Sequence, residues 1–537
     1  MKTLKRALCL ILVLALCLTL SLPALGAGVG GSAVGNAVTG AARWILSTVP
    51  DPGEGDYFWV VLSVARSGCK AEDSWYRSYL SAVRNELVAN GGALKSAQFY
   101  SHYSRAVLAF TALGQQPPEE LIRPLSNFEK VCSQGINGPL WALIAVDSGG
   151  YDMLPDPAAK TVATRQTYVD EILSRQLADG GWSLSGKGGD TTPSDTDITA
   201  MVLQALSAYT SQAAVRTAVD KALTCMSRKQ LANGGIGNYA DEECSESPAM
   251  MILALCALGL SPEDERFVKE GGSLVDAVLR FRQEDGHFRH IQEKDISPLI
   301  ATAESLLALT AVQRYNAGQT TVYRITDPLT LGAPGLPGKD PAVTLMPVAQ
   351  YKVSFPDLTG KACREAVLGL AARNILNGFT DGTFKPDDPM TRAQFAKTAV
   401  TALGISASGT ADFPDVAAKA WYNAAVATAV RYGIVNGRDD GRFDPESNID
   451  LQEAAAMVCR AAKLCGLDIS LGSAEADKLL SAYGDRAQVQ AWAKPTLAWC
   501  LKNGVVSRSG DLAPRAKMTR GEIAQMFWQL LKLAELR

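Results

Sequence analysis

The sequence predicts an all-α protein in two helical parts, and three observations support this fold class. Between about residues 28 and 316, apolar residues recur at helical spacing in runs that end at glycine-rich turns. A stretch rich in Pro, Gly and Thr follows at 319–350 and is expected to be a linker. After it, a different helical pattern recurs three times. A chain of 537 residues, 47% of them apolar, is long enough for several packed domains.

The first 27 residues have the parts of a secretory signal peptide. Lys2, Lys5 and Arg6 precede an uncharged apolar stretch at 7–22, and small residues suited to signal peptidase follow at 23–27. The alternative is a retained membrane anchor, because the apolar stretch approaches the length that spans a bilayer. No later segment has the length and apolarity of a membrane span. We therefore expect an exported chain with no retained membrane span.

The composition argues against a nucleic-acid partner, and the spacing of the cysteines indicates what role they have. The 52 basic and 55 acidic residues give a net charge of −3, so the chain as a whole offers no footprint for nucleic acid. The cysteines after residue 27 include no C-x-x-C pair and no zinc pattern. Several lie in apolar helical runs, so we expect small buried side chains rather than a disulfide framework.

Three similar turns divide the region 28–318. They begin at Gln176, Gln230 and Gln283, and their spacing of 54 and 53 residues indicates a repeated pair of helices. The turns resemble the Gln-Trp repeats of the squalene cyclase and protein prenyltransferase superfamily. The resemblance implies an α/α toroid of inner and outer helices, which is the terpenoid cyclase/prenyltransferase-like fold. Because cobalamin carriers share that fold, the resemblance implies a small apolar or cobalamin-like ligand. The fold does not determine which reaction, if any, the toroid catalyses.

One motif in this region has a catalytic counterpart. The run from Asp195 through Asp197 to Ala200 is similar to the Asp-x-Asp-Asp-Thr-Ala element of squalene-hopene cyclases. The resemblance implies that Asp197, with Asp195 beside it, protonates a substrate, which requires neighbours that stabilise the anion left behind. Ile198 replaces the third Asp of that element, and the region is roughly half as long as a two-toroid cyclase. The alternative is that Asp195 or Asp197 caps the helix opening at Ile198.

The pattern of metal-binding residue types predicts no metal and no cofactor. Protein prenyltransferases of this fold hold zinc with Asp, Cys and His. The histidines here are His102, His287 and His290, and Cys244 lacks the Asp-x-Cys pairing of that family.

Three segments after the linker open in the same way, with an aromatic residue two places before Asp357, Asp415 and Asp485. A helical run that stops at Gly follows each opening, and a tight turn containing Gly follows the run. A second helix then begins at Thr391 in the first copy and Thr519 in the third, each with Gln or Glu three residues later as a capping-box partner. The predicted repeats are 351–407, 408–470 and 478–537.

These repeats resemble the S-layer homology (SLH) family. The resemblance implies a pseudo-threefold helical assembly whose grooves bind the anionic secondary cell wall polysaccharide on peptidoglycan, and hence a place at the cell wall or S-layer surface. It assigns the polymer contact to Arg392 and Arg520, since a guanidinium can hold a carboxylate bidentately. The resemblance also assigns polysaccharide binding to residues of the repeat openings, which are Asp357, Asp415, Asp485, Trp421 and Trp492. The aspartates are expected to cap the following helix as well, and the tryptophans to pack or to stack on sugar.

The repeats also depart from the family pattern. Leu451 stands in the second repeat where Arg is expected, so that groove is expected to be weak or purely structural. Cys363 takes the Trp position of the first repeat. The alternative role for Arg392 and Arg520 is in surface ion pairs.

These features predict a secreted cell-surface protein, anchored non-covalently by three SLH repeats, whose toroid binds a ligand or acts as a scaffold. The alternative is an exported enzyme of the terpene cyclase/prenyltransferase-like superfamily that uses Asp197 as its acid. Asp197 separates the two: a carboxylate inside the ring favours the enzyme, whereas one bonded to its own helix terminus favours a carrier or scaffold.

Overall fold

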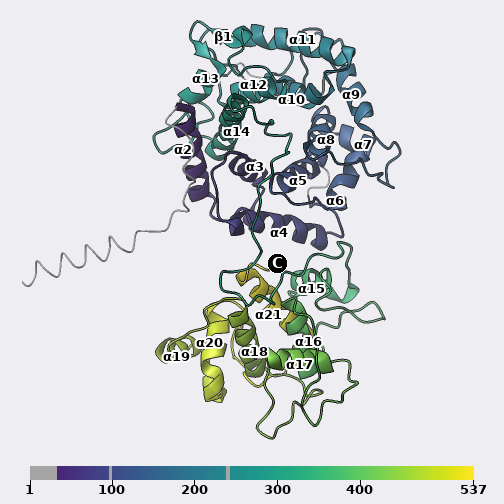
Figure 1. The fold of residues 1–537 in the computed structure, drawn as a ribbon, viewed down its shortest axis with the longest axis vertical. Helices are drawn as coiled ribbons and strands as arrows, with labels where there is room; N and C mark the ends of the chain where they lie inside the picture. The colour runs from purple at the N-terminus through teal and green to yellow at the C-terminus, as the bar shows by residue number, and fades with distance from the viewer. Residues whose placement is uncertain (1–32, 96–98, 238–241) are drawn as a thin grey trace, which may run out of the picture. The chain divides into compact units, whose positions relative to one another are not determined.

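The computed structural model describes residues 33–95, 99–237 and 242–537, so the predicted signal peptide at 1–27 lies outside the described residues. The chain divides into two compact units (Figure 1). Their bounds are Met1–Val83 with Ser96–Leu331 for the first unit, and Arg84–Lys95 with Gly332–Arg537 for the second.

Helices dominate both units, which confirms the all-α prediction. The strands of the described residues are β1 (Val268–Lys269) and β2 (Gly272–Ser273), which pair in one short antiparallel hairpin. No helix among the described residues is long and apolar enough to cross a membrane.

Six helices of the described part of the first unit form a closed ring, in which each packs against the next and the last returns to the first (Figure 1). In chain order they are α3 (Phe58–Arg66), α5 (Tyr100–Ala112), α8 (Asn137–Ser148), α10 (Thr196–Leu206), α12 (Glu246–Ala257) and α14 (Pro298–Asn316). Every position of α12 from Ser247 to Cys256 is buried, as expected for a helix with neighbours on all sides. The ring confirms the predicted toroid.

An outer layer surrounds this ring. Its helices are α2 (Ala33–Thr48), α4 (Asp73–Ala89), α6 (Glu119–Ile122), α7 (Phe128–Cys132), α9 (Arg165–Ser174), α11 (Ala213–Lys229) and α13 (Leu274–Arg280). Unlike α12, α11 buries one face only, at Val215, Ala218, Val219, Ala222 and Met226. That spacing is the amphipathic pattern of a helix covered on one side.

The repeated turns tie successive outer elements together. Gln176 donates from Nε2 to the carbonyl oxygen of Gly180 in its own turn (2.8 Å) and to that of Ala218 in α11 (2.9 Å). Gln230 repeats this bond pair with Gly234 (2.9 Å) and Phe267 (2.8 Å). Gln283 donates instead to Phe281, within its own segment. Two of the three glutamines therefore join one helix pair to the next.

The segment 319–331, expected as the first part of the linker, packs against the ring within the first unit. The carboxylate of Asp327 pairs with Arg66 at the end of α3 (2.9 Å) and with Arg314 of α14 (2.7 Å). The N–H of Leu329 donates to the carbonyl oxygen of Ala112, the last residue of α5 (2.8 Å). This segment therefore ties together the carboxyl ends of several inner helices.

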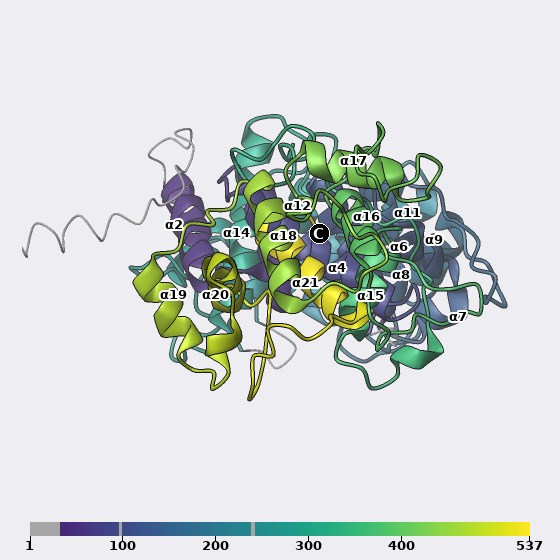
Figure 2. The ribbon, with the colours of Figure 1, turned by 90° about the horizontal axis from the view of Figure 1, so that it is seen from below.

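The second unit contains three helix pairs and one additional helix. The first helices of the pairs are α15 (Arg364–Ala371), α17 (Asn423–Arg431) and α20 (Lys494–Lys502). The second helices are α16 (Arg392–Ala402), α18 (Leu451–Leu464) and α21 (Arg520–Leu533). The additional helix, α19 (Ser473–Leu480), precedes the third pair. The second helices contact one another in the middle of the unit, with the first helices further out (Figure 2).

Replacing Gly234 by Ala tests the close approach at the repeated turns. Gly234 has a φ of +89°, and a Cβ there would lie 2.5 Å from the carbonyl oxygen of Gly272. Gly189 has a similar φ of +80° but nothing within 4 Å of such a Cβ. Both substitutions strain the backbone, but only Gly234→Ala also forces atoms apart.

We therefore expect Gly234→Ala to lower the free energy of unfolding of the first unit by about 1–3 kcal/mol more than Gly189→Ala. Urea unfolding of the full chain measures the difference. Equal losses for the two variants would contradict the close packing of the turn.

Candidate functional site

The three repeats of the second unit close on themselves in a cycle. The second helix of each repeat packs against the first helix of the next: α16 against α17, α18 against α20, and α21 against α15. We call these contacts junction 1/2, junction 2/3 and junction 3/1, after the repeats they join. This cyclic arrangement confirms the predicted pseudo-threefold assembly.

Backbone hydrogen bonds place the same helix position at every junction. The first residue of each second helix donates its N–H to a carbonyl oxygen in the next repeat. Arg392 donates to Ser447 (2.9 Å), Leu451 to Ala516 (3.1 Å) and Arg520 to Asp388 (2.9 Å). The backbone is therefore equivalent at the three junctions, and only the side chain at this position differs.

Both arginines at this position lie inside the protein. Arg392 is 3% exposed and donates from Nε to the carbonyl oxygen of Phe443 (2.9 Å). Arg520 is 6% exposed and donates from Nε to the carbonyl oxygen of Phe384 (2.9 Å) and from Nη2 to that of Asn377 (2.9 Å). Each guanidinium also lies over the ring of the phenylalanine that it bonds. They are not exposed surface ion pairs but parts of the contact between repeats.

The two charged junctions differ in their electrostatics. At junction 1/2, Arg392 pairs with Glu453 (3.1 Å), which also receives Arg438 (3.3 Å). Glu453 is the capping-box residue of α18, and the equivalent residue of α16 is the neutral Gln394. Within the described residues, Arg520 forms no ion pair at junction 3/1. Arg520 therefore has no direct ion-pair partner, and the charges of Asp388 and Asp357 act on its guanidinium without direct contact.

Junction 2/3 carries no arginine at this position. Leu451 is fully buried there. The capping-box residue Glu522, which is the counterpart of Glu453, pairs instead with Arg508 (2.5 Å). This junction therefore packs through an apolar side chain, as the departure from the family pattern predicted for a structural contact.

The three aspartates of the repeat openings hold the tight turns. Asp415 accepts the N–H groups of Phe443 (3.0 Å) and Asp444 (2.7 Å), and Asp444 has a left-handed φ of +57°. Asp357 and Asp485 make the equivalent pairs of bonds in their own repeats. The expectation that they cap the following helix is wrong, because the turn's N–H groups occupy the carboxylates. Carboxylates of this kind stabilise a strained turn.

The two tryptophans of the openings lie at the surface. Trp421 is 58% exposed and Trp492 is 55% exposed, whereas Cys363 at the equivalent position of the first repeat is buried. The ammonium group of Lys397, on α16, lies 5.1 Å from the centre of the Trp421 ring. An exposed indole beside a cation offers an apolar face and a positive charge to a ligand.

In the toroid, the two aspartates of the predicted acid motif have different roles. Asp195 accepts the N–H of Ile198 (2.9 Å) and caps α10, as the alternative interpretation expected. Asp197 lies in the first turn of α10, and its Oδ1 is buried without a hydrogen-bond partner among the described residues. Burial raises the pKa of Asp197 to about 6, opposed by a hydrogen bond from Ser247 and reinforced by the charges of Asp195 and Glu246.

Further charged groups from neighbouring inner helices surround Asp197. Burial raises the pKa of Glu304 on α14 well above its usual range, and the charges of Glu246 and Asp197 add to the shift. Arg105 on α5 opposes it. Arg105 lies 5.8 Å from the ring centre of Trp59 on α3. The ring therefore encloses acids, one nearby arginine and an aromatic side chain.

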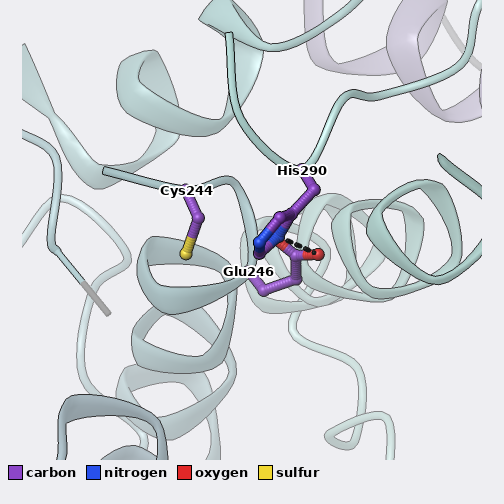
Figure 3. Close-up of side chains that lie close together, drawn as sticks. All are labelled: Cys244, Glu246 and His290. Carbon is purple, nitrogen blue, oxygen red and sulfur yellow. Dashed lines mark hydrogen bonds and ion pairs between the residues drawn. The ribbon is translucent and has the colours of Figure 1, made fainter. Parts of the chain in front are cut away.

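Beside Asp197 the structure brings together Cys244, Glu246 and His290 (Figure 3). The Nδ1 atom of His290 lies 2.8 Å from Oε2 of Glu246, and Sγ of Cys244 lies 3.2 Å from the Ser247 hydroxyl. One donor atom from each of the three residues lies within 4.8 Å of the others. The Asp-x-Cys pattern of protein prenyltransferases does not identify this cluster, because the chain has Cys-x-Glu where the inner helix α12 begins.

Acidification tests the aspartate that holds the turn of the second repeat. Burial raises the pKa of Asp415, but the N–H groups of Phe443 and Asp444 outweigh it, so the pKa lies below its usual value. A folded-state pKa below the unfolded one stabilises the protein above the unfolded pKa, and this is lost as pH falls through the folded pKa. Asp415→Asn should lower the melting temperature of the second unit at pH 7, and this deficit should shrink below about pH 4.

Calorimetry of the full chain measures this deficit. The exposed Asp439 in the same turn supplies the control variant Asp439→Asn, which should match the parent protein at every pH. A deficit of constant size from pH 7 to pH 3 would rule out the charged clamp.

Asp197→Asn should change the melting temperature in the opposite direction to Asp415→Asn. Because the folded-state pKa of Asp197 is raised to about 6, ionisation of this carboxyl disfavours the folded state once pH rises above the unfolded value. The substitution should therefore raise the melting temperature of the first unit at pH 7.5. The gain should shrink as pH falls from the folded-state pKa toward about 3, where the carboxyl is protonated in both the folded and the unfolded state. Melting in chelator-containing buffer measures it, with the exposed Asp220→Asn as control.

Solved structures similar to the chain include two enzymes. They are the type II terpene cyclase MstE from Scytonema (13% identity, TM-score 0.36, 53% of this chain and 99% of that one) and the unsaturated glucuronyl hydrolase from Bacillus sp. GL1 (12%, 0.38, 55% and 98%). With TM-scores this low, the toroid assignment rests on the packing of its own helices.

Each of three sequence relatives matches about a third of the chain or less. The surface-layer 125 kDa protein of Lysinibacillus sphaericus is 33% identical over 35% of this chain and 16% of its own length. The exoglucanase XynX of Acetivibrio thermocellus is 28% identical (34% and 17%), and a cell surface protein of Thermoanaerobacter kivui is 34% identical (28% and 18%). The chain thus spans less than a fifth of the length of each of these relatives.

The family model for the S-layer homology domain matches the chain three times, at residues 354–396, 412–455 and 482–524. Each match runs from a repeat opening, through its aspartate-held turn, into the second helix of that repeat. The cyclic unit of this protein is therefore built from three S-layer homology domains, which locate the protein at the cell-wall surface.

Proposed function

We propose that this protein is exported by its N-terminal signal peptide and held non-covalently on the cell wall through an anionic secondary polysaccharide. In this proposal the toroid is displayed at the surface, where it binds a small ligand or acts as a scaffold. The observation that carries the anchoring role is that Arg520 at junction 3/1 has no direct ion-pair partner, whereas Arg392 at junction 1/2 is paired with Glu453.

The junctions are not equivalent as anion sites. A carboxylate or pyruvate ketal of the polymer can pair with Arg520 without displacing a protein carboxylate. At junction 1/2 the same ligand has to compete with Glu453 for Arg392 and Arg438. Junction 2/3 offers Leu451 in place of an arginine. We therefore rank the junctions 3/1, 1/2 and 2/3 in order of decreasing contribution to binding.

The aspartates and tryptophans have separate parts in this proposal. Asp357 and Asp415 support binding indirectly, because they hold the turns whose carbonyl oxygens accept from Arg520 and Arg392. Asp485 holds the equivalent turn at junction 2/3, where Leu451 replaces the arginine. Trp421 and Trp492 contact the polymer directly by stacking on sugar rings, since more than half of each side chain is exposed.

A second candidate function for the toroid is acid catalysis by Asp197. The buried and unpartnered Oδ1 of Asp197 favours it, because a carboxyl bonded to its own helix terminus would have indicated a scaffold. A raised pKa keeps part of such a carboxyl protonated near neutral pH, as a general acid requires. If Asp197→Asn leaves stability unchanged at pH 7.5, this candidate loses its support.

Two substitutions that exchange Gln and Glu at equivalent positions test the ranking of the junctions. Gln394→Glu should supply Arg520 with the partner it lacks and weaken sedimentation with purified cell walls. Glu453→Gln should release Arg392 from its ion pair and strengthen sedimentation with the walls. Both side chains serve in a capping box, so neither change should unfold the helix. We expect at least about a threefold change in apparent affinity in each direction, from interactions worth about 1 kcal/mol.

Walls stripped of their secondary polymer provide the control, because both variants and the parent protein should fail to bind them. Raising the ionic strength should reduce binding to intact walls, since added salt screens the ion pairs. Unchanged affinity in both variants, with melting temperatures equal to the parent's, would refute the role of the junctions.

A further inference from the structure

We infer that Cys244, Glu246 and His290 form a binding site for a single Zn²⁺ ion inside the toroid. The three residues come from two segments that lie far apart in the sequence. Cys244 precedes α12, Glu246 is the first residue of that helix, and His290 precedes α14. The N–H of Ser245 donates to the carbonyl oxygen of His290 (3.1 Å), so the backbone itself holds the two segments together.

The donor atoms lie within 4.8 Å of one another, so side-chain rotation is needed to bring all three to a tetrahedral ion. Oxygen and nitrogen ligands about 2.0–2.1 Å from zinc lie about 3.3 Å apart at a tetrahedral angle, and sulfur at about 2.3 Å lies slightly further from each of them. The Nδ1 atom of His290 and the Oε2 atom of Glu246 are 2.8 Å apart and share a hydrogen bond. Side-chain rotation that opens this pair by about 0.5 Å admits the ion in place of the shared proton.

The donor types favour zinc over other common ions. Thiolate, imidazole and carboxylate are together the ligands that zinc accepts, whereas calcium and magnesium require oxygen ligands alone. Cys244 is 1% exposed, so its sulfur is positioned by the surrounding protein rather than by solvent.

The surrounding charge also favours a cation. The carboxyl groups of Asp197, Glu246 and Glu304 influence one another, and the positive groups that act on them are His290 and Arg105. The Oδ1 atom of Asp197 is buried and has no hydrogen-bond partner among the described residues. An unpaired buried acceptor beside an excess of carboxyl groups indicates a missing positive partner.

Three protein ligands would leave one coordination position open. Among the described residues, the cluster contains no fourth Cys, His, Asp or Glu ligand. Structural zinc sites are closed by four protein ligands, whereas sites with three carry a water or a substrate atom at the fourth position. An ion here would therefore bind a water or ligand next to Asp197, and the site belongs to the ligand-binding part of the toroid rather than to its framework.

Zinc retention by the full chain tests this site. The protein is stripped with chelator, incubated with ZnCl₂ and passed through a desalting column, and bound zinc is measured by mass spectrometry. We expect one zinc per chain in the parent protein. Cys244→Ser, Glu246→Gln and His290→Gln should each lower the affinity at least about tenfold. Cys132→Ser and His287→Gln, which change a cysteine and a histidine outside the cluster, should retain it.

Cobalt supplies a readout that depends on the sulfur ligand. Co²⁺ in the parent protein should give a thiolate-to-cobalt charge-transfer absorption that Cys132→Ser keeps and Cys244→Ser loses. Calorimetry identifies any variant that fails to fold. The inference is overturned if the folded parent protein retains no zinc, if all three ligand variants retain it as tightly as the parent, or if the cobalt complex lacks the thiolate absorption.

Discussion

The second unit depends on one backbone interaction, which is the hydrogen bond from the start of each second helix to the next repeat. Since these N–H groups belong to the first turn of a helix, they have no partner inside it and must find one elsewhere. Arg392, Leu451 and Arg520 use them to join the three repeats in a cycle. The side chain at the same position then decides the character of each junction: a neutralised arginine, a leucine or an arginine without a carboxylate partner. The electrostatics of the three junctions thus differ although their backbone framework is the same.

The buried arginines hold the repeats together, and in the proposed function the same guanidinium groups bind the polymer. Each guanidinium uses part of its donor set on carbonyl oxygens of the next repeat and lies over a phenylalanine ring. These contacts fix the orientation of the planar fork before any ligand arrives, so less conformational entropy is lost on binding. The cost is that such a residue cannot be removed without disturbing the fold. Electrostatic changes at its neighbours, Gln394 and Glu453, therefore separate binding from stability better than removal of the arginine.

The toroid shows a different constraint, which is the burial of charge. Its inner helices are apolar along most of their length, yet acids enter the ring at the amino ends of α10 and α12 and one turn into α14. Placing Asp197, Glu246 and Glu304 near one another destabilises the folded protein unless protons or a cation compensate. A fold that needed only a rigid scaffold would gain from apolar residues at these positions. Their presence supports the proposal that the toroid binds a ligand.

Apart from the toroid, which was implied by a resemblance to a known superfamily, the sequence by itself determined the helical class and both sets of repeats. Helical periodicity, glycine turns and capping boxes are local signals that recur at fixed spacing. The sequence also identified Arg392, Arg520 and the departure at Leu451. Only the tertiary structure decided that Glu453 pairs with one arginine while the other has no direct ion-pair partner. It also decided that the aspartates hold turns rather than helix ends, and that Cys244, Glu246 and His290 meet. Each of these depends on contacts between segments distant in the chain, and the distance between two such side chains is set by packing, which no local pattern encodes.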